Sequence, residues 1–116
     1  MNIFGHDYHF LLTVGASADI ADLCPEGDIE RLNEALTGAY SHTLDVAMGM
    51  IIAMSKGYEN NRELVDPGYV PKPLTRDQLL NLTQQEFAAL EEEAVKAFAV
   101  SKERAVEVDT PEAKKN

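Results

Sequence analysis

The sequence contains no tryptophan, a single cysteine, and half as many basic as acidic side chains. Because Cys24 has no second cysteine in the chain, it cannot form an intramolecular disulfide or a zinc site built from several thiolates. The longest uncharged apolar run, residues 46–54, is much shorter than the roughly 20 residues that a membrane-spanning helix requires. The first residues also lack the basic region of a signal peptide, so we expect a cytoplasmic protein with no membrane partner.

The acidic residues are unevenly distributed along the chain. The net charge is −10, from twenty acidic and ten basic side chains. Residues 102–116 hold four of each sign, so sixteen acids and six bases remain in residues 1–101. A domain with this charge repels the phosphate backbone of DNA and RNA, and we therefore expect no nucleic acid among its partners. The simplest consequence of the charge is high solubility.

The N-terminal residues are typical of a small β-hairpin. Residues 3–4 predict one strand and residues 8–13 a second, because both segments are rich in aromatic and β-forming side chains. Residues 5–7, Gly-His-Asp, are expected to form the turn between them. An isolated hairpin is barely stable in water, so this one should pack against a helical layer.

Helical signals follow the hairpin. We expect one short helix over residues 16–23, a second between Asp28 and Gly38, and a third over residues 41–56 that ends before Gly57. Apolar residues cover most of the circumference of the third helix: Leu44, Val46, Met48, Met50, Ile51, Ile52 and Met54. A helix that is apolar on most sides is usually the central helix of its domain.

The helical period is lost between residues 57 and 73, where Pro67 and Gly68 predict a turn. We expect a long ordered connection here. The apolar residues that should attach it to the core are Leu64, Val65, Tyr69 and Val70.

Two consecutive capping boxes predict the last two helices. Thr75 is followed three residues later by Gln78, and Thr83 by Glu86, a spacing that satisfies free amide groups at a helix N-terminus. The second helix is the longer one, and its apolar face is formed by Phe87, Leu90, Ala94, Ala97 and Phe98. After about residue 103 no apolar period remains, which predicts a disordered tail over residues 104–116.

Together these segments predict a mainly α fold. A short N-terminal β-hairpin should pack on a bundle of about five helices, forming a single domain over residues 1–103. We expect its core to include Phe10, Leu12, Ile20, Leu32, Leu36, Leu44, Ile51, Leu80, Phe87 and Leu90.

Residues suited to catalysis are few and dispersed. His6 and His9 are three positions apart but fall on a predicted turn and strand, and no further ligand cluster completes a metal site. No serine lies in a nucleophile motif, and no glycine-rich loop is present to hold a phosphate group. We therefore expect a protein that is not an enzyme and has no metal or cofactor.

The apolar helix faces indicate a different kind of site, a surface for protein partners. Met48, Met50, Met54, Phe87 and Phe98 could form a groove for amphipathic segments, since methionine adapts to irregular surfaces. The same residues also fit the interior of the domain, and the sequence favours that alternative for any one of them.

The order of these features resembles a known family. Residues 5–12 (Gly-His-Asp-Tyr-His-Phe-Leu-Leu) form a hairpin signature that leads into a small helix. An apolar third helix, a break and the Leu-Thr-Arg-Asp-Gln-Leu-Leu segment at residues 74–80 follow, before an amphipathic helix and a polar tail. Over residues 3–100 this arrangement resembles the small tail assembly chaperones of long-tailed bacteriophages and prophages. The members of that family differ widely in sequence, so no single residue here identifies it.

The resemblance implies a non-catalytic role in the cytoplasm of the bacterial host, outside the mature virion. Such chaperones bind the tape measure protein and keep it soluble while tail tube subunits assemble around it. In many of these phages a minus-one frameshift near the end of the gene adds an extension that recruits the tail tube protein. The codons of Lys114, Lys115 and Asn116 would form the slippery sequence A-AAA-AAC if the gene uses AAA and AAC there. A homo-oligomer is compatible with the sequence.

A small acidic regulator that mimics DNA is the alternative function. Such a protein needs its carboxylates in a row at phosphate-like spacing on one face. Here the acids alternate with the apolar positions of every predicted helix, which is typical of ordinary solvated faces. A third alternative is an orphan enzyme subunit or a structural piece of a larger complex.

Overall fold

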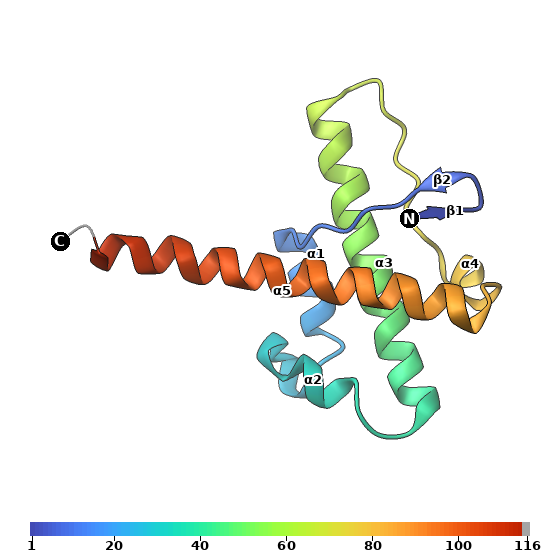
Figure 1. The fold of residues 1–116 in the computed structure, drawn as a ribbon, viewed down its shortest axis with the longest axis horizontal. Coiled ribbons are helices and arrows are strands. Elements are labelled where there is room, and N and C mark those ends of the chain that lie inside the picture. The colour runs from blue at the N-terminus through green and yellow to red at the C-terminus, as the bar shows by residue number, and fades with distance from the viewer. Residues whose placement is uncertain (115–116) are drawn as a thin grey trace.

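The computed structural model describes the backbone of residues 1–114 and the side chains of residues 1–101. Within this part of the chain the protein is mainly helical, with five α-helices and a two-stranded antiparallel hairpin at the N-terminus (Figure 1). The predicted fold class is therefore confirmed. The disordered tail predicted for residues 104–116 falls outside the residues that are described in full. Among the described residues, none of the helices has the length and apolar character needed to cross a membrane.

The hairpin is shorter than predicted. Its strands are β1 (Asn2–Ile3) and β2 (His6–Asp7), which pair antiparallel. Phe4 and Gly5 form the turn with φ angles of 50° and 82°, the left-handed pair that suits a tight two-residue hairpin turn. The predicted turn at residues 5–7 is therefore wrong, because the chain reverses at Phe4 and Gly5, and His6 and Asp7 belong to β2.

Residues 8–13, predicted as the second strand, form an extended segment outside the sheet. This segment lies against α3 (Tyr40–Val65), where the Leu11 amide donates a hydrogen bond of 3.1 Å to the Met54 carbonyl oxygen. Tyr8, at its start, is buried. Tyr8 still pairs with Met1, because its amide donates a hydrogen bond of 2.8 Å to the Met1 carbonyl oxygen and its carbonyl oxygen accepts one of 2.8 Å from the Met1 amino group. The residues that follow leave the hairpin and pack on the central helix instead.

The helices between this segment and α3 differ in regularity. α1 (Val14–Ala21) is capped by the hydroxyl of Thr13 and lies along α3. A short 3-10 helix, η1 (Pro25–Gly27), comes next. The second helix, predicted between Asp28 and Gly38, is divided into a 3-10 helix, η2 (Ile29–Arg31), and one turn of α-helix, α2 (Leu32–Ala35). α2 leads into α3 through a short loop (Figure 1).

α3 is longer than predicted. It continues to Val65 instead of ending at Lys56. Gly57 lies within the helix and does not end it. A glycine is needed at this position because a β-carbon would lie 2.5 Å from the Leu11 carbonyl oxygen. Leu64 and Val65, predicted to attach a connection to the core, lie instead on the last turn of α3 and are exposed.

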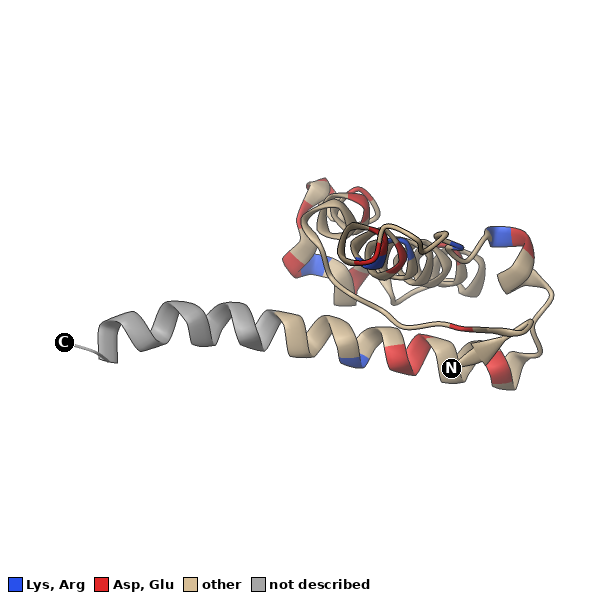
Figure 2. Ribbon diagram, turned by 90° about the horizontal axis from the view of Figure 1, so that it is seen from above, with Lys and Arg blue, Asp and Glu red and all other residues tan. Residues whose placement is uncertain are grey.

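Both predicted capping boxes are present. Thr75 and Gln78 exchange reciprocal hydrogen bonds at the start of α4 (Arg76–Leu80). The second box does the same at the start of α5 (Gln84–Lys114). α5 runs across α3 in Figure 1, and Figure 2 shows it as a separate layer beside the other helices.

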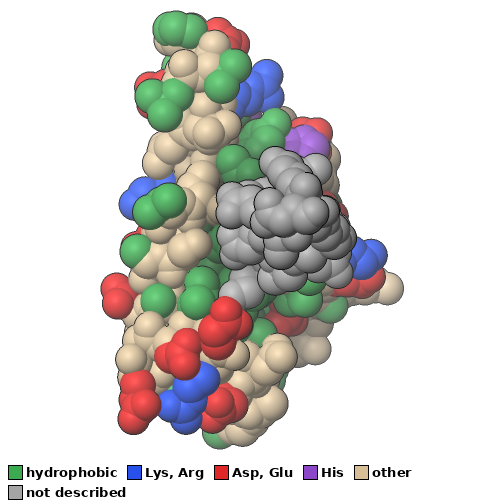
Figure 3. Space-filling view, turned by 90° about the vertical axis from the view of Figure 1, so that its left-hand side faces the viewer, with side chains coloured by type: hydrophobic (Ala, Val, Ile, Leu, Met, Phe, Trp, Pro, Cys, Tyr) green, Lys and Arg blue, Asp and Glu red, His purple; other side chains and the backbone are tan. Residues whose placement is uncertain are grey.

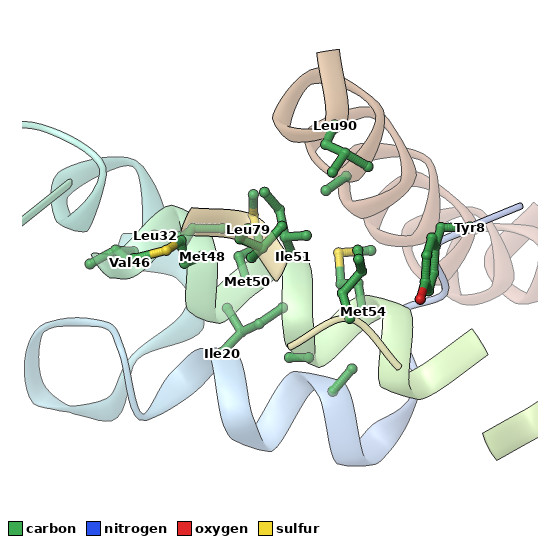
Figure 4. Close-up of a cluster of buried hydrophobic side chains, with 14 of the residues drawn as sticks. Tyr8, Ile20, Leu32, Val46, Met48, Met50, Ile51, Met54, Leu79 and Leu90 are labelled. Atoms are coloured by element: carbon green, nitrogen blue, oxygen red, sulfur yellow. The ribbon is translucent and has the colours of Figure 1, made fainter. Parts of the chain in front are cut away.

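The core is built on α3, whose buried side chains face α1 on one side and α5 on the other (Figure 4). Of the residues predicted for the core, four are buried: Ile20, Leu32, Ile51 and Leu90. Five more are half-buried against it: Phe10, Leu12, Leu36, Leu44 and Phe87. The prediction for Leu80 is wrong, because α4 turns the neighbouring Leu79 inward and leaves Leu80 exposed.

Candidate functional site

The residues predicted for partner binding lie in two kinds of position. Met48, Met50 and Met54 belong to the core, with exposed fractions of 1%, 0% and 0%. The predicted methionine-rich surface is therefore wrong, because α1 and α5 cover α3 from both sides. Phe87 and Phe98 are half-buried on α5, and each lines a hollow on the surface.

The first hollow, lined by Phe87, lies between α4, α5 and the N-terminal half of α3, and its volume is about 480 Å³. The buried side chain of Met48 lies at its base, beside the half-buried Leu44. Tyr40 and Leu80, with exposed fractions of 68% and 53%, border the same hollow. This hollow therefore combines an apolar base with large apolar side chains that water can reach.

The second hollow, lined by Phe98, lies between α2, α3 and α5, and its volume is about 320 Å³. The buried Met50 lies at its base, and the half-exposed Val95 borders it. Leu36, which ends α2, lines both hollows. Figure 3, which views the molecule from the left-hand side of Figure 1, shows hydrophobic side chains interspersed with acidic and basic ones on the described surface.

The two hollows follow one another along a single face of α5. The α5 residues that line them are Gln84, Phe87, Ala88, Glu91, Val95, Phe98 and Ala99. Their spacing of three or four residues places them on one side of the helix. Leu36 borders both hollows, and together we call them the α5 groove, with the buried Met48 behind the first hollow and the buried Met50 behind the second.

One charged side chain, Glu91, belongs to the residues that line the α5 groove. The bases on η2, on α4 and on the described part of α5 each pair with an acid: Arg31 with Glu34 at 2.8 Å, Arg76 with Asp45 at 2.9 Å, and Lys96 with Glu92 at 3.1 Å. The remaining bases of residues 1–101, Lys56, Arg62 and Lys72, belong to the C-terminal half of α3 and the connection after it. The lining of the groove therefore carries one negative charge and no positive charge within the described residues.

A buried carboxylate lies in the C-terminal half of α3, away from the residues that line the α5 groove. Glu59 is fully buried and accepts hydrogen bonds from the Tyr69 hydroxyl at 2.6 Å and the Lys72 amide at 2.7 Å. His6 Nε2 lies 3.1 Å from the same carboxylate. Burial acts to raise the pKa of Glu59, but these hydrogen bonds outweigh burial and lower the pKa below its ordinary value. Burial and the carboxylate together raise the pKa of Tyr69 to about 12.

This polar cluster, Glu59 with His6, Tyr69 and Lys72, joins the hairpin, α3 and the connection that follows. Sequence reasoning missed it because Glu59 was assigned to a loop. Continuing the helical period from Ile51 through position 55 would have placed Glu59 on the core side of α3. Each of its three partners bonds to the same carboxylate, which gives the cluster a structural role.

Unused polar groups are scarce in the described residues. Within residues 1–101, every buried side-chain nitrogen and oxygen has a hydrogen-bond partner. Nor does that part of the chain contain a group of three or more side chains suited to hold a metal ion. His9, the second histidine noted in the sequence, bonds to Asp7 at 3.0 Å instead of joining His6 at Glu59.

The predicted frameshift codons, those of Lys114, Lys115 and Asn116, concern the message and lie outside the residues described in full. The candidate site therefore consists of the α5 groove, with Phe87 and Phe98 as the predicted residues that contribute to it.

In comparisons with known proteins, no family model, no curated protein and no solved structure matches this chain.

Proposed function

We propose that this protein binds amphipathic helices without catalysis, and that it serves as a tail assembly chaperone of a long-tailed bacteriophage or prophage. Its client would be the tape measure protein, which it keeps soluble in the host cytoplasm while the tail tube assembles. The observation that carries the proposal is the α5 groove, since an apolar groove between helices is a common seat for the apolar face of another helix.

The exposed apolar side chains along the groove support a binding role. Tyr40, Leu80 and Val95 are all at least 42% exposed and all border the same surface. Exposed apolar residues that gather at one surface, instead of being scattered singly, are typical of interaction sites. A partner that covers them removes apolar area from water, which favours association.

The acidic surface suits a protein that keeps another one in solution. Sixteen of the twenty acids fall within residues 1–101, so the domain keeps a large negative charge even after its six bases are counted. Charge of one sign makes complexes repel each other and opposes aggregation. A long helical client covered by such domains would carry their charge along its length.

A frameshifted form would supply the second partner, the tail tube protein. In this proposal the α5 groove holds the tape measure protein, and an extension beyond Asn116 recruits tube subunits. The short form needs only the groove. The two binding functions can therefore be separated by truncation.

Co-expression tests the proposed function. The protein should be produced together with a tape-measure-like helical protein, and the soluble fraction of that client compared with and without the chaperone. We expect a severalfold rise in soluble client and no shift of duplex DNA at physiological salt. An unchanged soluble fraction would contradict the proposal, and inhibition of a DNA-binding protein would favour the acidic regulator instead.

A further inference from the structure

We propose that the α5 groove selects cationic amphipathic helices, in which lysine or arginine flanks a narrow apolar stripe. This inference rests on the proposed function for the helical nature of the partner. It adds the surface, the length of the bound segment and the charge that the segment must carry. Each of these follows from a separate feature of the groove.

The length follows from α5. The residues that line the groove run from Gln84 to Ala99, a distance of about 22 Å at a rise of 1.5 Å per residue. A partner helix that lies along α5 is therefore in contact for about four turns. The groove is too long for a single anchoring side chain and fits a continuous helical segment.

The spacing of the anchors follows from the two hollows. Ala88 and Glu91 line the first hollow, and Val95 and Phe98 line the second at positions seven residues further on. Seven residues correspond to about 10 Å, or two turns of helix. A partner helix should therefore place two large apolar side chains about seven residues apart, one in each hollow.

The charge follows from the border of the groove. Glu91 faces the groove, while the neighbouring bases Arg76 and Lys96 are already paired with acids. Lysine or arginine beside the apolar stripe of a partner would find the carboxylate of Glu91 and no basic side chain among the residues that line the groove, and an acidic partner would be repelled. A second copy of this chain is disfavoured for the same reason, because each copy carries a net charge of −10.

Binding of synthetic peptides tests the charge requirement. Three labelled helical peptides of about 18 residues, five turns, should share one leucine stripe and carry lysine, glutamate or glutamine on their flanks. We expect the lysine peptide to bind at least about tenfold more tightly than the glutamate peptide in fluorescence anisotropy, with a smaller difference at high salt. Equal affinities for the lysine and glutamate peptides, or no binding of any peptide, would overturn the inference.

Matched variants test the surface. Leu80→Ser and Val95→Ser each remove an exposed apolar side chain that borders the groove and should weaken the lysine peptide about tenfold. Leu64→Ser and Val70→Ser remove apolar side chains elsewhere that are even more exposed, and they should change its affinity by less than about twofold. Circular dichroism confirms that all four variants remain folded. An equal loss in both pairs places the peptide elsewhere and overturns the inference.

Glu91→Gln isolates the charge of the groove. It should weaken the lysine peptide and leave the glutamine peptide unchanged, whereas Glu63→Gln, on the far end of α3, should affect neither. Sedimentation of the free protein provides one further outcome. A dimer that dissociates when Val95 is replaced by serine would assign the groove to a second copy and overturn the inference.

Failure of the inference can be distinguished from failure of the proposed function. If the client stays soluble but the groove variants support it as well as the wild type does, the inference fails and the chaperone function stands. If the lysine peptide binds the groove as described but no client is kept soluble, the chaperone function fails and the assignment of the groove stands.

Discussion

The hydroxyl of Tyr69 donates a hydrogen bond of 2.6 Å to the buried carboxylate of Glu59. The same carboxylate accepts the amide of Lys72, so both ends of the segment 69–72 are tied to α3. A buried charge is unfavourable unless hydrogen bonds compensate for lost hydration, and here the structure supplies them. The chain after α3 is therefore held by the carboxylate of Glu59 as well as by the buried Leu74, whereas Val70 is exposed.

Removal of the Tyr69 hydroxyl should destabilise the protein. Tyr69→Phe keeps the ring, which lies 4.4 Å from the Arg62 guanidinium, and removes the hydrogen bond to Glu59 together with the 3.2 Å hydrogen-bond contact with His6 Nε2. We expect a loss of about 1–3 kcal/mol in the free energy of unfolding, measured by urea denaturation. The control Tyr40→Phe, at an exposed side chain, should change stability by less than about 0.5 kcal/mol. Equal effects of the two substitutions would contradict the role of the bond.

The stability that Glu59 contributes should depend on pH. Its pKa is lowered in the folded protein, so unfolding in acid takes up a proton. The contribution is complete above the ordinary pKa of 4.5 and is lost as the pH falls through the lower, folded value. We expect the difference in unfolding free energy between wild type and Glu59→Gln to narrow below pH 4.5, as measured by urea unfolding across the acid range.

The control for this experiment is Glu34→Gln. The pKa of Glu34 is also lowered, by its hydrogen bond with Arg31, but the side chain is exposed and solvent screens the pair. Its substitution should leave the pH dependence close to that of the wild type. A gap between wild type and Glu59→Gln that stays constant from neutral pH into acid would show that Glu59 does not hold a charge in the folded state.

Local sequence signals predicted much of the fold. The capping boxes at Thr75 and Thr83 depend on residues three positions apart, and both were confirmed. The hydrophobic period placed Ile51 and Leu90 correctly in the core. Such features depend on neighbours in sequence and need no knowledge of what packs against the element.

The errors share a long-range cause. Gly57 looked like a helix terminator, but it lies within α3 because the backbone of Leu11, far away in sequence, passes against it. Glu59 was assigned to a loop as an ordinary polar residue, since local sequence does not reveal a partner as distant as His6, 53 positions away. The depth of a side chain likewise depends on what covers it: Met54 is fully buried, whereas Phe87 lies at the edge of the layer formed by α5.

The core and the groove border should respond differently to truncation. Ile51 is fully buried on α3, so Ile51→Ala should cost about 2–5 kcal/mol by leaving a cavity. Leu80 borders the α5 groove and is 53% exposed, so Leu80→Ala should cost much less. Thermal or urea unfolding of both variants makes the comparison. A similar loss in both would mean that the α5 groove is part of the packed core and not a free surface.

The contact between Gly57 and Leu11 predicts the sign of two alanine substitutions. Alanine is favoured over glycine in a helix, so a glycine that has room for a β-carbon should tolerate Gly→Ala with a gain of about 0.5–1 kcal/mol. Gly15 on α1 has that room, since the nearest atom to its β-carbon would be Thr13 Oγ1 at 3.9 Å. Gly57→Ala instead forces a β-carbon to within 2.5 Å of a backbone oxygen, which cannot rotate away. We expect Gly57→Ala to lose about 1–3 kcal/mol in urea unfolding while Gly15→Ala gains, because displacing the segment also strains its bond to Met54. Stabilisation by both substitutions would show that the extended segment does not cross α3 at this point.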